Sequence, residues 1–247
     1  MQLINKIGHK KGQIALLIDP EKTNSESRLK ALTEKAKIGK IDFFFVGGST
    51  VSRSAIEHVV TYLKSNSSIP VIIFPGASHQ ICKEADGLLF LNLISGRNPD
   101  YLIGHQIAAA EEIFNLDFEI ISTSYLLIDG GILSSVAYVS QTTPIPRDQI
   151  NIALNTAKAG SLIGHQLVYL DAGSGAKYAV PEKIIDAIHK NVQSPIIVGG
   201  GIRSIEKIKQ LTDAGANVIV IGNMIEDNID FLLDIASYQN AKSALKY

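Results

Sequence analysis

The stretch YLDAGSGA, residues 169–176, ends an apolar run in a polar turn spaced by glycines. Residues 167–170 are branched or aromatic, as in a strand, and the glycines free the following backbone to turn its amides outward. Such a turn can hold an anion. Asp171 could orient or deprotonate a hydroxyl of the bound ligand, with Tyr169 as a nearby donor. The alternative for Asp171 is a solvated loop acid.

Two further stretches repeat this design. Residues 196–198 run into Gly199, Gly200 and Gly201, and residues 218–221 run into Gly222-Asn223. A single glycine turn needs no explanation beyond tight loop geometry. Three consecutive strand ends of this type, however, are what the last βα units of an eight-stranded barrel supply for a phosphate group. The sequence therefore predicts a phosphate site.

Asp19 and Ser49 follow the first two apolar runs, residues 14–18 and 43–46. Strand ends of a barrel face one shared cavity, so a carboxylate and a hydroxyl from neighbouring strands can point at the same ion. Two such ligands suit magnesium, which keeps waters and takes other ligands from substrate phosphates. The alternative is that Asp19 only shapes a turn before Pro20.

Strand-like and helix-like segments alternate along the chain, and this favours either a closed barrel or an open doubly wound sheet. We expect the barrel, because eight strands fit and polar signals follow strands one, two, six, seven and eight. We interpret residues 1–247 as one domain of this α/β class. The expected strands are residues 14–18, 43–46, 70–74, 87–91, 118–128, 167–170, 196–198 and 218–221.

Two segments depart from a regular barrel. Residues 75–86, between the third and fourth strands, are too short and too broken by turn residues for a full crossover helix, so we expect the third helix to be shortened or missing. Residues 129–146 form the longest irregular segment and are a candidate lid. We expect a helix over residues 101–114, and others over residues 52–64, 147–159, 181–191 and 204–214.

Composition narrows the function. Lys plus Arg (23) nearly balance Asp plus Glu (24), and no basic cluster is present, which argues against a nucleic-acid partner. The single Cys82 cannot form an intramolecular disulfide, and the amino terminus lacks the apolar core of a signal peptide, so we expect a cytoplasmic protein. The sequence contains no nucleophile-elbow, dinucleotide or P-loop motif.

Six motifs, in order over nearly the whole chain, resemble the geranylgeranylglyceryl phosphate synthase family. They are IDPEK at 18–22, VGGST at 46–50, NPDYLIGHQ at 98–106, YLDAGSGA at 169–176, VGGGIRS at 198–204 and IGN at 221–223. The resemblance implies a magnesium-dependent prenyltransferase on a modified TIM (β/α)8 barrel that lacks the third helix. Such an enzyme joins sn-glycerol 1-phosphate to geranylgeranyl diphosphate or another prenyl diphosphate, in ether-lipid synthesis.

The resemblance also implies roles for individual residues. It implies that Asp19 and Ser49 bind Mg2+. The catalytic residues that we expect, Asp171 and Tyr169, follow from their position beside the turn. The glycerol phosphate is implied to contact the residues of the three glycine turns. These are Tyr169, Leu170, Asp171, Ala172, Gly173, Ser174, Gly175, Gly200, Gly201, Gly222 and Asn223.

Two positions depart from the family pattern. Asp171 stands where the family usually has Glu. Because the Asp side chain is one methylene shorter, its distance to the glycerol hydroxyl, and with it the role of Asp171 as the base, is at issue. Leu17 stands where one branch has Lys, so the sequence resembles the other branch, whose members often assemble as hexamers built from dimers. We therefore expect a homo-oligomer, either a dimer or a hexamer. A transient contact with a membrane surface is compatible with a lipid substrate.

Two other functions stay open. The first is a phosphate-binding barrel isomerase or aldolase, which shares the glycine turns but needs an acid and base pair across the cavity. Asp19 has no convincing second partner for that role. The second is a barrel that binds a phosphometabolite without catalysis. The prenyl chain length is not fixed by the sequence, because it depends on the depth of an apolar groove.

Overall fold

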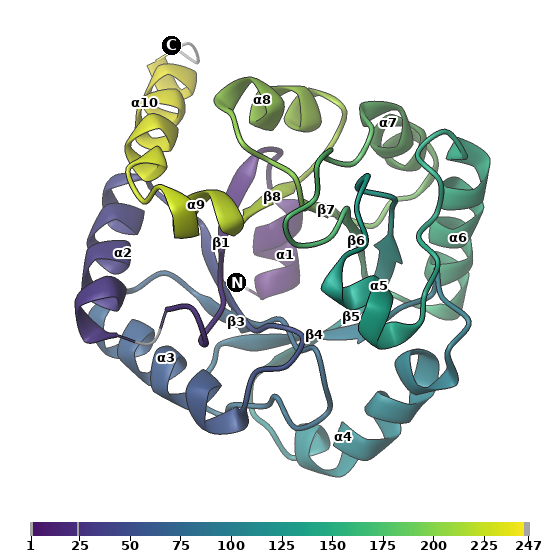
Figure 1. The fold of residues 1–247 in the computed structure, drawn as a ribbon, viewed down its shortest axis with the longest axis horizontal. Helices are drawn as coiled ribbons and strands as arrows, with labels where there is room; N and C mark the ends of the chain where they lie inside the picture. The colour runs from purple at the N-terminus through teal and green to yellow at the C-terminus, as the bar shows by residue number, and fades with distance from the viewer. Residues whose placement is uncertain (1, 24, 245–247) are drawn as a thin grey trace.

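Eight parallel strands close into a barrel in the computed structural model, which describes residues 2–23 and 25–244 (Figure 1). Neighbouring strands pair in chain order, and β1 pairs with β8 to complete the ring. The expected barrel is therefore confirmed. The strands are β1 (Gln13–Ile18), β2 (Phe43–Val46), β3 (Val71–Ile73), β4 (Gly87–Asn92), β5 (Glu119–Leu127), β6 (Leu167–Asp171), β7 (Ile196–Gly199) and β8 (Val218–Ile221).

Alternate side chains of each strand belong to two different cores. In β6, Leu167 and Tyr169 pack inside the barrel, whereas Val168 and Leu170 pack against the surrounding helices. Successive side chains of a strand point to opposite faces, so Asp171 also faces the interior. The same alternation explains why the strands are apolar almost throughout, since both faces are buried.

An outer layer of helices surrounds the barrel (Figure 1). In α7, for example, Ile184, Ile185 and Ile188 recur at helical spacing and are fully buried. The helices of this layer are α2 (Glu26–Ile38), α3 (Arg53–Asn66), α4 (His105–Phe114), α6 (Ile150–Ile163), α7 (Glu182–Asn191), α8 (Ile205–Asp213) and α10 (Phe231–Ala244). The short helix α9 (Asn223–Asp227) lies between β8 and α10.

The connection between β3 and β4 contains no helix, as the sequence predicted. Residues 75–86 form only turns and bends. Gln80 holds this connection in place, because its side-chain amide donates to the carbonyl oxygens of Gly48 and Val51 and accepts from the amide of Gly76. The outer layer is therefore open beside β4.

The segment that precedes α4 is not the regular α-helix that we expected. It is a π-helical turn, η1 (Asp100–Gly104), that continues into α4. Contacts with β4 explain the difference: the Asn92 side chain donates to the carbonyl of Leu102 at 2.7 Å, and the amide of Leu93 donates to the carbonyl of Tyr101 at 3.1 Å. These bonds draw backbone carbonyls toward the strand.

Helix α1 (Leu3–Gly8) was not expected from the sequence, and it closes the barrel at the amino-terminal ends of the strands. Figure 1 shows it at the centre of the ring. Leu3 and Ile7 join the interior core, and the Glu119 carboxylate at the start of β5 accepts from the amides of Leu3 and Ile4. The carboxylate thus satisfies donors that the first turn of a helix leaves free.

The long segment of residues 129–146 is less irregular than expected, since it contains the short helix α5 (Ser135–Ser140). Backbone bonds between Leu127 or Asp129 and Ile145 tie both ends of the segment to the end of β5. Whether it closes over a ligand stays a prediction.

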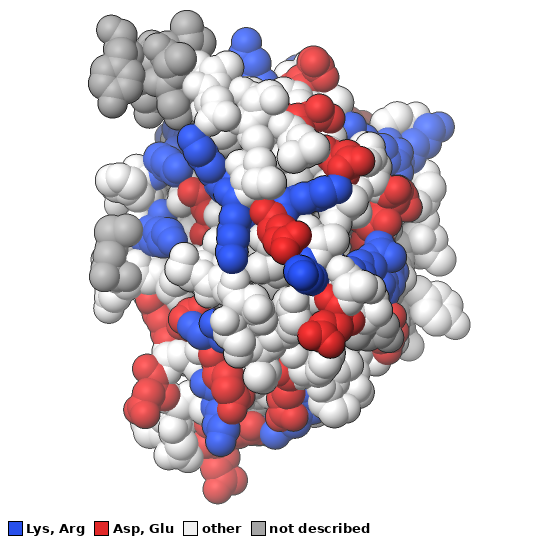
Figure 2. Space-filling view, turned by 90° about the vertical axis from the view of Figure 1, so that its left-hand side faces the viewer, with Lys and Arg blue, Asp and Glu red and all other residues white. Residues whose placement is uncertain are grey.

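Charges of both signs alternate on the molecular face shown in Figure 2, and no single-sign patch dominates it. No helix among residues 2–23 and 25–244 has the length and apolar character needed to cross a membrane.

Candidate active site

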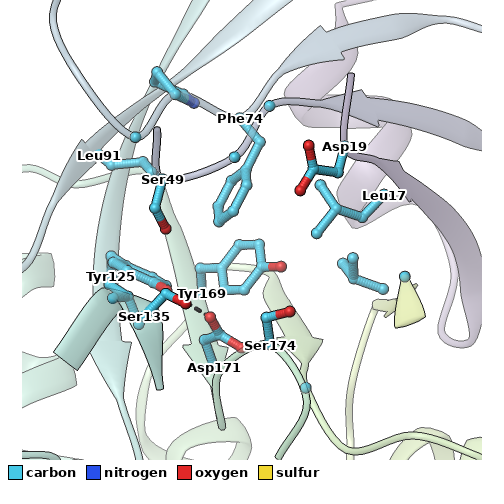
Figure 3. A pocket seen from close by; sticks show the side chains of 18 of the residues that line it. Leu17, Asp19, Ser49, Phe74, Leu91, Tyr125, Ser135, Tyr169, Asp171 and Ser174 are labelled. Carbon is cyan, nitrogen blue, oxygen red and sulfur yellow. Dashed lines mark hydrogen bonds between the residues drawn. The ribbon is translucent and has the colours of Figure 1, made fainter. Parts of the chain in front are cut away.

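A cavity of about 410 Å³ opens at the carboxyl ends of the barrel strands. Every strand or the turn after it contributes to its wall, from Asp19 after β1 to Gly222 after β8. Figure 3 shows the side chains of Asp19, Ser49, Tyr169 and Asp171 around one shared space. The barrel thus brings together the residues from which the sequence predicted a metal site and a hydroxyl-binding site.

The three glycine turns meet on one side of this cavity, as the sequence predicted. Gly173 (φ 91°), Gly175 (φ 74°), Gly200 (φ 84°) and Gly201 (φ 69°) all have the positive φ that other residues rarely adopt. A Cβ at Gly200 would stand 2.8 Å from the backbone nitrogen and oxygen of Gly173. Glycine is therefore required where the turns after β6 and β7 touch. We refer to the three turns as the glycine cradle.

The Asn223 side chain occupies donors of the glycine cradle. Its Oδ1 accepts from the amide of Gly175 at 3.0 Å and faces the Ser174 hydroxyl at 3.1 Å. The Asn223 amide group therefore holds the β6 turn against the end of β8. An anion in the cradle would compete with Asn223 for the same hydrogen atoms.

Asp171 is buried beside the cavity, and each of its two carboxylate oxygens accepts one hydrogen bond. Tyr125 donates its hydroxyl to Oδ2 at 2.5 Å, and the amide of Gly173 donates to Oδ1 at 2.8 Å. Burial raises the pKa of Asp171 above its ordinary value, while these two hydrogen bonds act in the opposite direction. Asp171 is therefore not a solvated loop acid. A buried carboxyl whose pKa is raised is suited to accept a proton.

Aromatic rings fix the position of Asp171 and of the neighbouring Tyr169. Tyr169 stacks on Phe74, with ring centroids 5.0 Å apart, and meets Tyr125 edge to face at 5.5 Å. Burial raises the pKa of both tyrosines well above the ordinary value, and the Asp171 charge raises them further. Both hydroxyls therefore keep their protons and can donate a hydrogen bond, as Tyr125 does to Asp171.

Asp19 and Ser49 lie on the cavity wall, and the Asp19 carboxylate also shapes its own turn. Its Oδ1 accepts a hydrogen bond from the amide of Glu21 at 3.0 Å, so Asp19 does shape the turn at Pro20, as the alternative interpretation expected. The side chain stays 24% exposed and borders the cavity, which leaves oxygen lone pairs for a cation. In the part of the chain that the structure describes, no group of three or more His, Cys, Asp and Glu could hold a metal. The donor set fits only an ion that takes most ligands from substrate and water.

An apolar groove extends the cavity outward past β4. Leu88 and Phe90 belong to the outward face of this strand, yet both line the cavity, because no helix lies between β3 and β4. The far wall of the groove comes from Ile81 and from Ala109 and Ile113 of α4. The cavity therefore joins a polar cradle to an apolar channel.

Three residues of the predicted phosphate site do not line the cavity. Leu170 and Ala172 pack outward against the helices, because side chains alternate along β6, and Gly173 uses its amide to hold Asp171. These residues shape the cradle from behind. The other predicted residues do border the cavity. They are Tyr169, Asp171, Ser174, Gly175, Gly200, Gly201, Gly222 and Asn223.

Several polar residues that line the cavity were missed by the sequence interpretation, among them Tyr125, Lys22 and Glu226. Tyr125 lies on an inward position of β5, so the two-residue strand period could have indicated it. Lys22 stands within the IDPEK motif, three residues after Asp19. Glu226 follows Asn223 by three residues in α9, and no sequence signal pointed to it.

Comparisons with known proteins agree with this geometry. The chain is 43% identical to geranylgeranylglyceryl phosphate synthase of Chitinophaga pinensis over 92% of its length and 90% of that protein. It is 40% identical to the protein of this name from Korarchaeum cryptofilum, over 94% of each chain. The crystal structure of (S)-3-O-geranylgeranylglyceryl phosphate synthase from Thermoplasma acidophilum, in complex with sn-glycerol-1-phosphate, superimposes with a TM-score of 0.88, at 33% identity and 96% coverage of both chains. The model of the PcrB family matches residues 6–239. This chain therefore belongs to the PcrB family.

Proposed function

We propose that this protein transfers a prenyl group from geranylgeranyl diphosphate, or another long prenyl diphosphate, to sn-glycerol 1-phosphate. The products are a prenylglyceryl phosphate ether and diphosphate, and the reaction belongs to ether-lipid synthesis. One observation carries the proposal: a single cavity joins the glycine cradle, which suits a phosphate ester, to an apolar groove, which suits a prenyl chain. The names of the relatives agree with this assignment.

Two carboxylates on the cavity wall have different proposed roles: Asp171 accepts a proton, and Asp19 binds the metal. The hydroxyl oxygen of the glycerol phosphate forms a bond to the first carbon of the prenyl group, and the bond from that carbon to the diphosphate oxygen breaks. The electron pair of the broken bond leaves with the diphosphate. Asp171 accepts the hydroxyl proton, and Tyr125 and Gly173 hold its carboxylate in place.

Magnesium is part of the proposal, and Asp19 and Ser49 are its proposed ligands. Bound there, the ion would neutralise negative charge on the diphosphate leaving group. The chain itself contributes positioning: the cradle fixes the acceptor, and the groove walls of Leu88, Phe90 and Ile113 exclude water from the prenyl chain.

The test is product formation from radiolabelled sn-glycerol 1-phosphate offered with C15, C20 and C35 prenyl diphosphates, each with and without magnesium. The sn-3-phosphate serves as the stereochemical control. We expect a magnesium-dependent ether product from the sn-1-phosphate, and the preferred donor length reports the depth of the groove. Phosphate binding without an ether product from any donor would favour the non-catalytic binding barrel instead.

We further propose that the protein is a homo-oligomer. Large apolar side chains stand exposed on α4 and α6, which are neighbours in the outer layer of Figure 1. Phe114 is 91% exposed and Leu162 is 89% exposed, and Ile107, Ile152 and Ile163 of the same helices are exposed as well. Exposed apolar side chains that gather on one face mark an interaction surface. Light scattering is expected to give a dimer or a hexamer, and Leu162→Glu is expected to lower the mass if these helices form the contact.

A further inference from the structure

A chain of polar contacts links the loop after β1 to the glycine cradle. The Lys22 Nζ lies 2.8 Å from the Glu226 Oε2, and the Asn223 side-chain amide donates to the same oxygen at 3.4 Å. The other end of the Asn223 amide group contacts Ser174 and Gly175. All five residues line the cavity.

The Lys22–Glu226 pair places two opposite charges close to the position expected for a phosphate. The contacts of Asn223 in the cradle involve neutral groups, namely the Gly175 amide, the Ser174 hydroxyl and the Asn223 side-chain amide. Arg203 and Asp171 are further charged residues that border the same cavity. A phosphate ester carries up to two negative charges at neutral pH. The Glu226 carboxylate would repel this anion, and Lys22 offsets that repulsion.

Asn223 connects the charge pair to the ligand. A phosphate that binds Gly175 and Ser174 displaces the Asn223 Oδ1 from those donors. The Asn223 Nδ2 is then the end of the side chain that can donate to the anion, and Glu226 competes for the same hydrogen atoms. Lys22 and Asn223 both bind the Glu226 carboxylate. The ion pair with Lys22 therefore affects how strongly Glu226 holds the Asn223 amide, and so how readily this amide rotates toward the phosphate.

We propose that Lys22 and Glu226 are positioning residues that set the affinity of the glycine cradle for a phosphate ester, acting through Asn223. Lys22 favours the bound anion, and Glu226 opposes it while it holds the Asn223 amide. This inference rests on the proposed function, since it assumes that the cradle holds the glycerol phosphate.

The backbone at Glu226 does not depend on Lys22 for its position. The Arg28 guanidinium donates to the Glu226 carbonyl oxygen at 2.8 Å, and the amide of Glu226 bonds to Gly222 within the turn of α9. A change at Lys22 therefore alters the charge next to Glu226 without freeing the helix. It also alters the charge next to Asp19, whose Oδ2 lies 4.0 Å from the Lys22 Nζ. Lys35, on α2, forms a similar ion pair with Asp230, outside the cavity. This second pair supplies a matched control.

The experiment measures the dissociation constants of sn-glycerol 1-phosphate and inorganic phosphate by isothermal titration calorimetry, without metal or prenyl donor. Lys22→Met is expected to weaken binding about tenfold, and Glu226→Gln to tighten it about threefold, because the two changes remove opposite charges near the anion. The double variant is expected to fall between the single variants. Lys22→Arg is expected to restore most of the affinity, and Lys35→Met to leave it unchanged.

The signs of the effects separate this role from a structural one. If the pair only fastened the loop after β1 to α9, both single variants would weaken binding or leave it unchanged, and both would lower the melting temperature. Either result overturns the inference while the proposed function stands. If the unmodified protein binds neither sn-glycerol 1-phosphate nor inorganic phosphate, the glycine cradle is not a phosphate site, and the inference about Lys22 and Glu226 is wrong as well.

Discussion

Asp171 is the residue that accepts the proton in the proposed reaction. Its carboxylate is buried, accepts hydrogen bonds from Tyr125 and Gly173, and faces the cavity. The family usually has Glu at this position, but a shorter side chain reaches the cavity here because it projects from the last inward position of β6. The geometry therefore supports the base role that the sequence comparison had put at issue.

Replacing the carboxylate tests this role. Asp171→Asn keeps an oxygen that can accept from the Gly173 amide but removes the proton acceptor, so kcat is expected to fall by about two to four orders of magnitude. Glycerol phosphate binding is expected to change far less. Steady-state kinetics and calorimetry provide the two measurements. Asp171→Glu is the matched variant, and activity within about tenfold of the original is expected because the charge is retained.

Tyr125 sets the pH at which Asp171 can act. The hydrogen bond from Tyr125 lowers the pKa of the Asp171 carboxyl and thereby opposes the effect of burial. Tyr125→Phe removes this bond, so the pKa rises and less carboxylate is present at a given pH. The acid limb of the kcat profile is expected to move to higher pH, with activity recovered on the alkaline side. A profile that drops uniformly at all pH values would contradict this prediction.

At the scale of elements, the site depends on the contact between the turns after β6 and β7. Gly200 lies against the backbone of Gly173 and within 2.9 Å of the Asp171 Oδ1, measured from the Cβ that alanine would add. The first turn belongs to a connection over residues 172–181, and the second to one over residues 200–204. A Cβ at Gly200 would therefore press on the β6 turn and on Asp171 together.

Gly200→Ala is expected to cost about 1 to 3 kcal/mol of unfolding free energy and to weaken glycerol phosphate binding, because both φ and space forbid the methyl group. Chemical denaturation and calorimetry measure the two effects. Gly164→Ala is the control: its φ is also positive, at 102°, but nothing lies within 4 Å of the added carbon. It is expected to share the backbone strain and to leave binding intact.

At the scale of the whole molecule, the site is divided between two arcs of the barrel. The proposed magnesium ligands, Asp19 and Ser49, follow β1 and β2, whereas the glycine cradle follows β6, β7 and β8. Closure of the ring through the pairing of β1 with β8 makes the two arcs neighbours. The first arc can therefore bind magnesium, and the second can bind the phosphate ester.

Removal of magnesium is expected to affect the two arcs differently. Chelation with EDTA is expected to abolish ether formation, because the leaving diphosphate loses its counter-charge, while the dissociation constant of sn-glycerol 1-phosphate stays within about twofold. Activity assays and calorimetry on the same chelated sample compare the two. An equal loss of phosphate binding would mean that the ion belongs to the cradle and not to Asp19 and Ser49.

Local sequence patterns determined the strands, the glycine turns and the missing third helix. Apolar runs that end in glycine specify buried strands and their turns through backbone sterics alone. The interval of residues 75–86 is near the shortest length that a crossover needs, and its Pro and Gly residues disfavour a helix there. The strands, the glycine turns and the missing helix depend on residues that are close together in the sequence, so a short stretch of sequence is enough to predict them.

Only the tertiary structure decided which polar groups meet. Tyr125 and Asp171 are 46 residues apart, and Lys22 and Glu226 are 204 residues apart, so no local pattern relates them. Their contact depends on how the strands stagger and close into a ring. The same holds for Leu170, which the motif included but the strand period turned outward, and for α1, whose apolar side chains have no partner until the barrel interior exists.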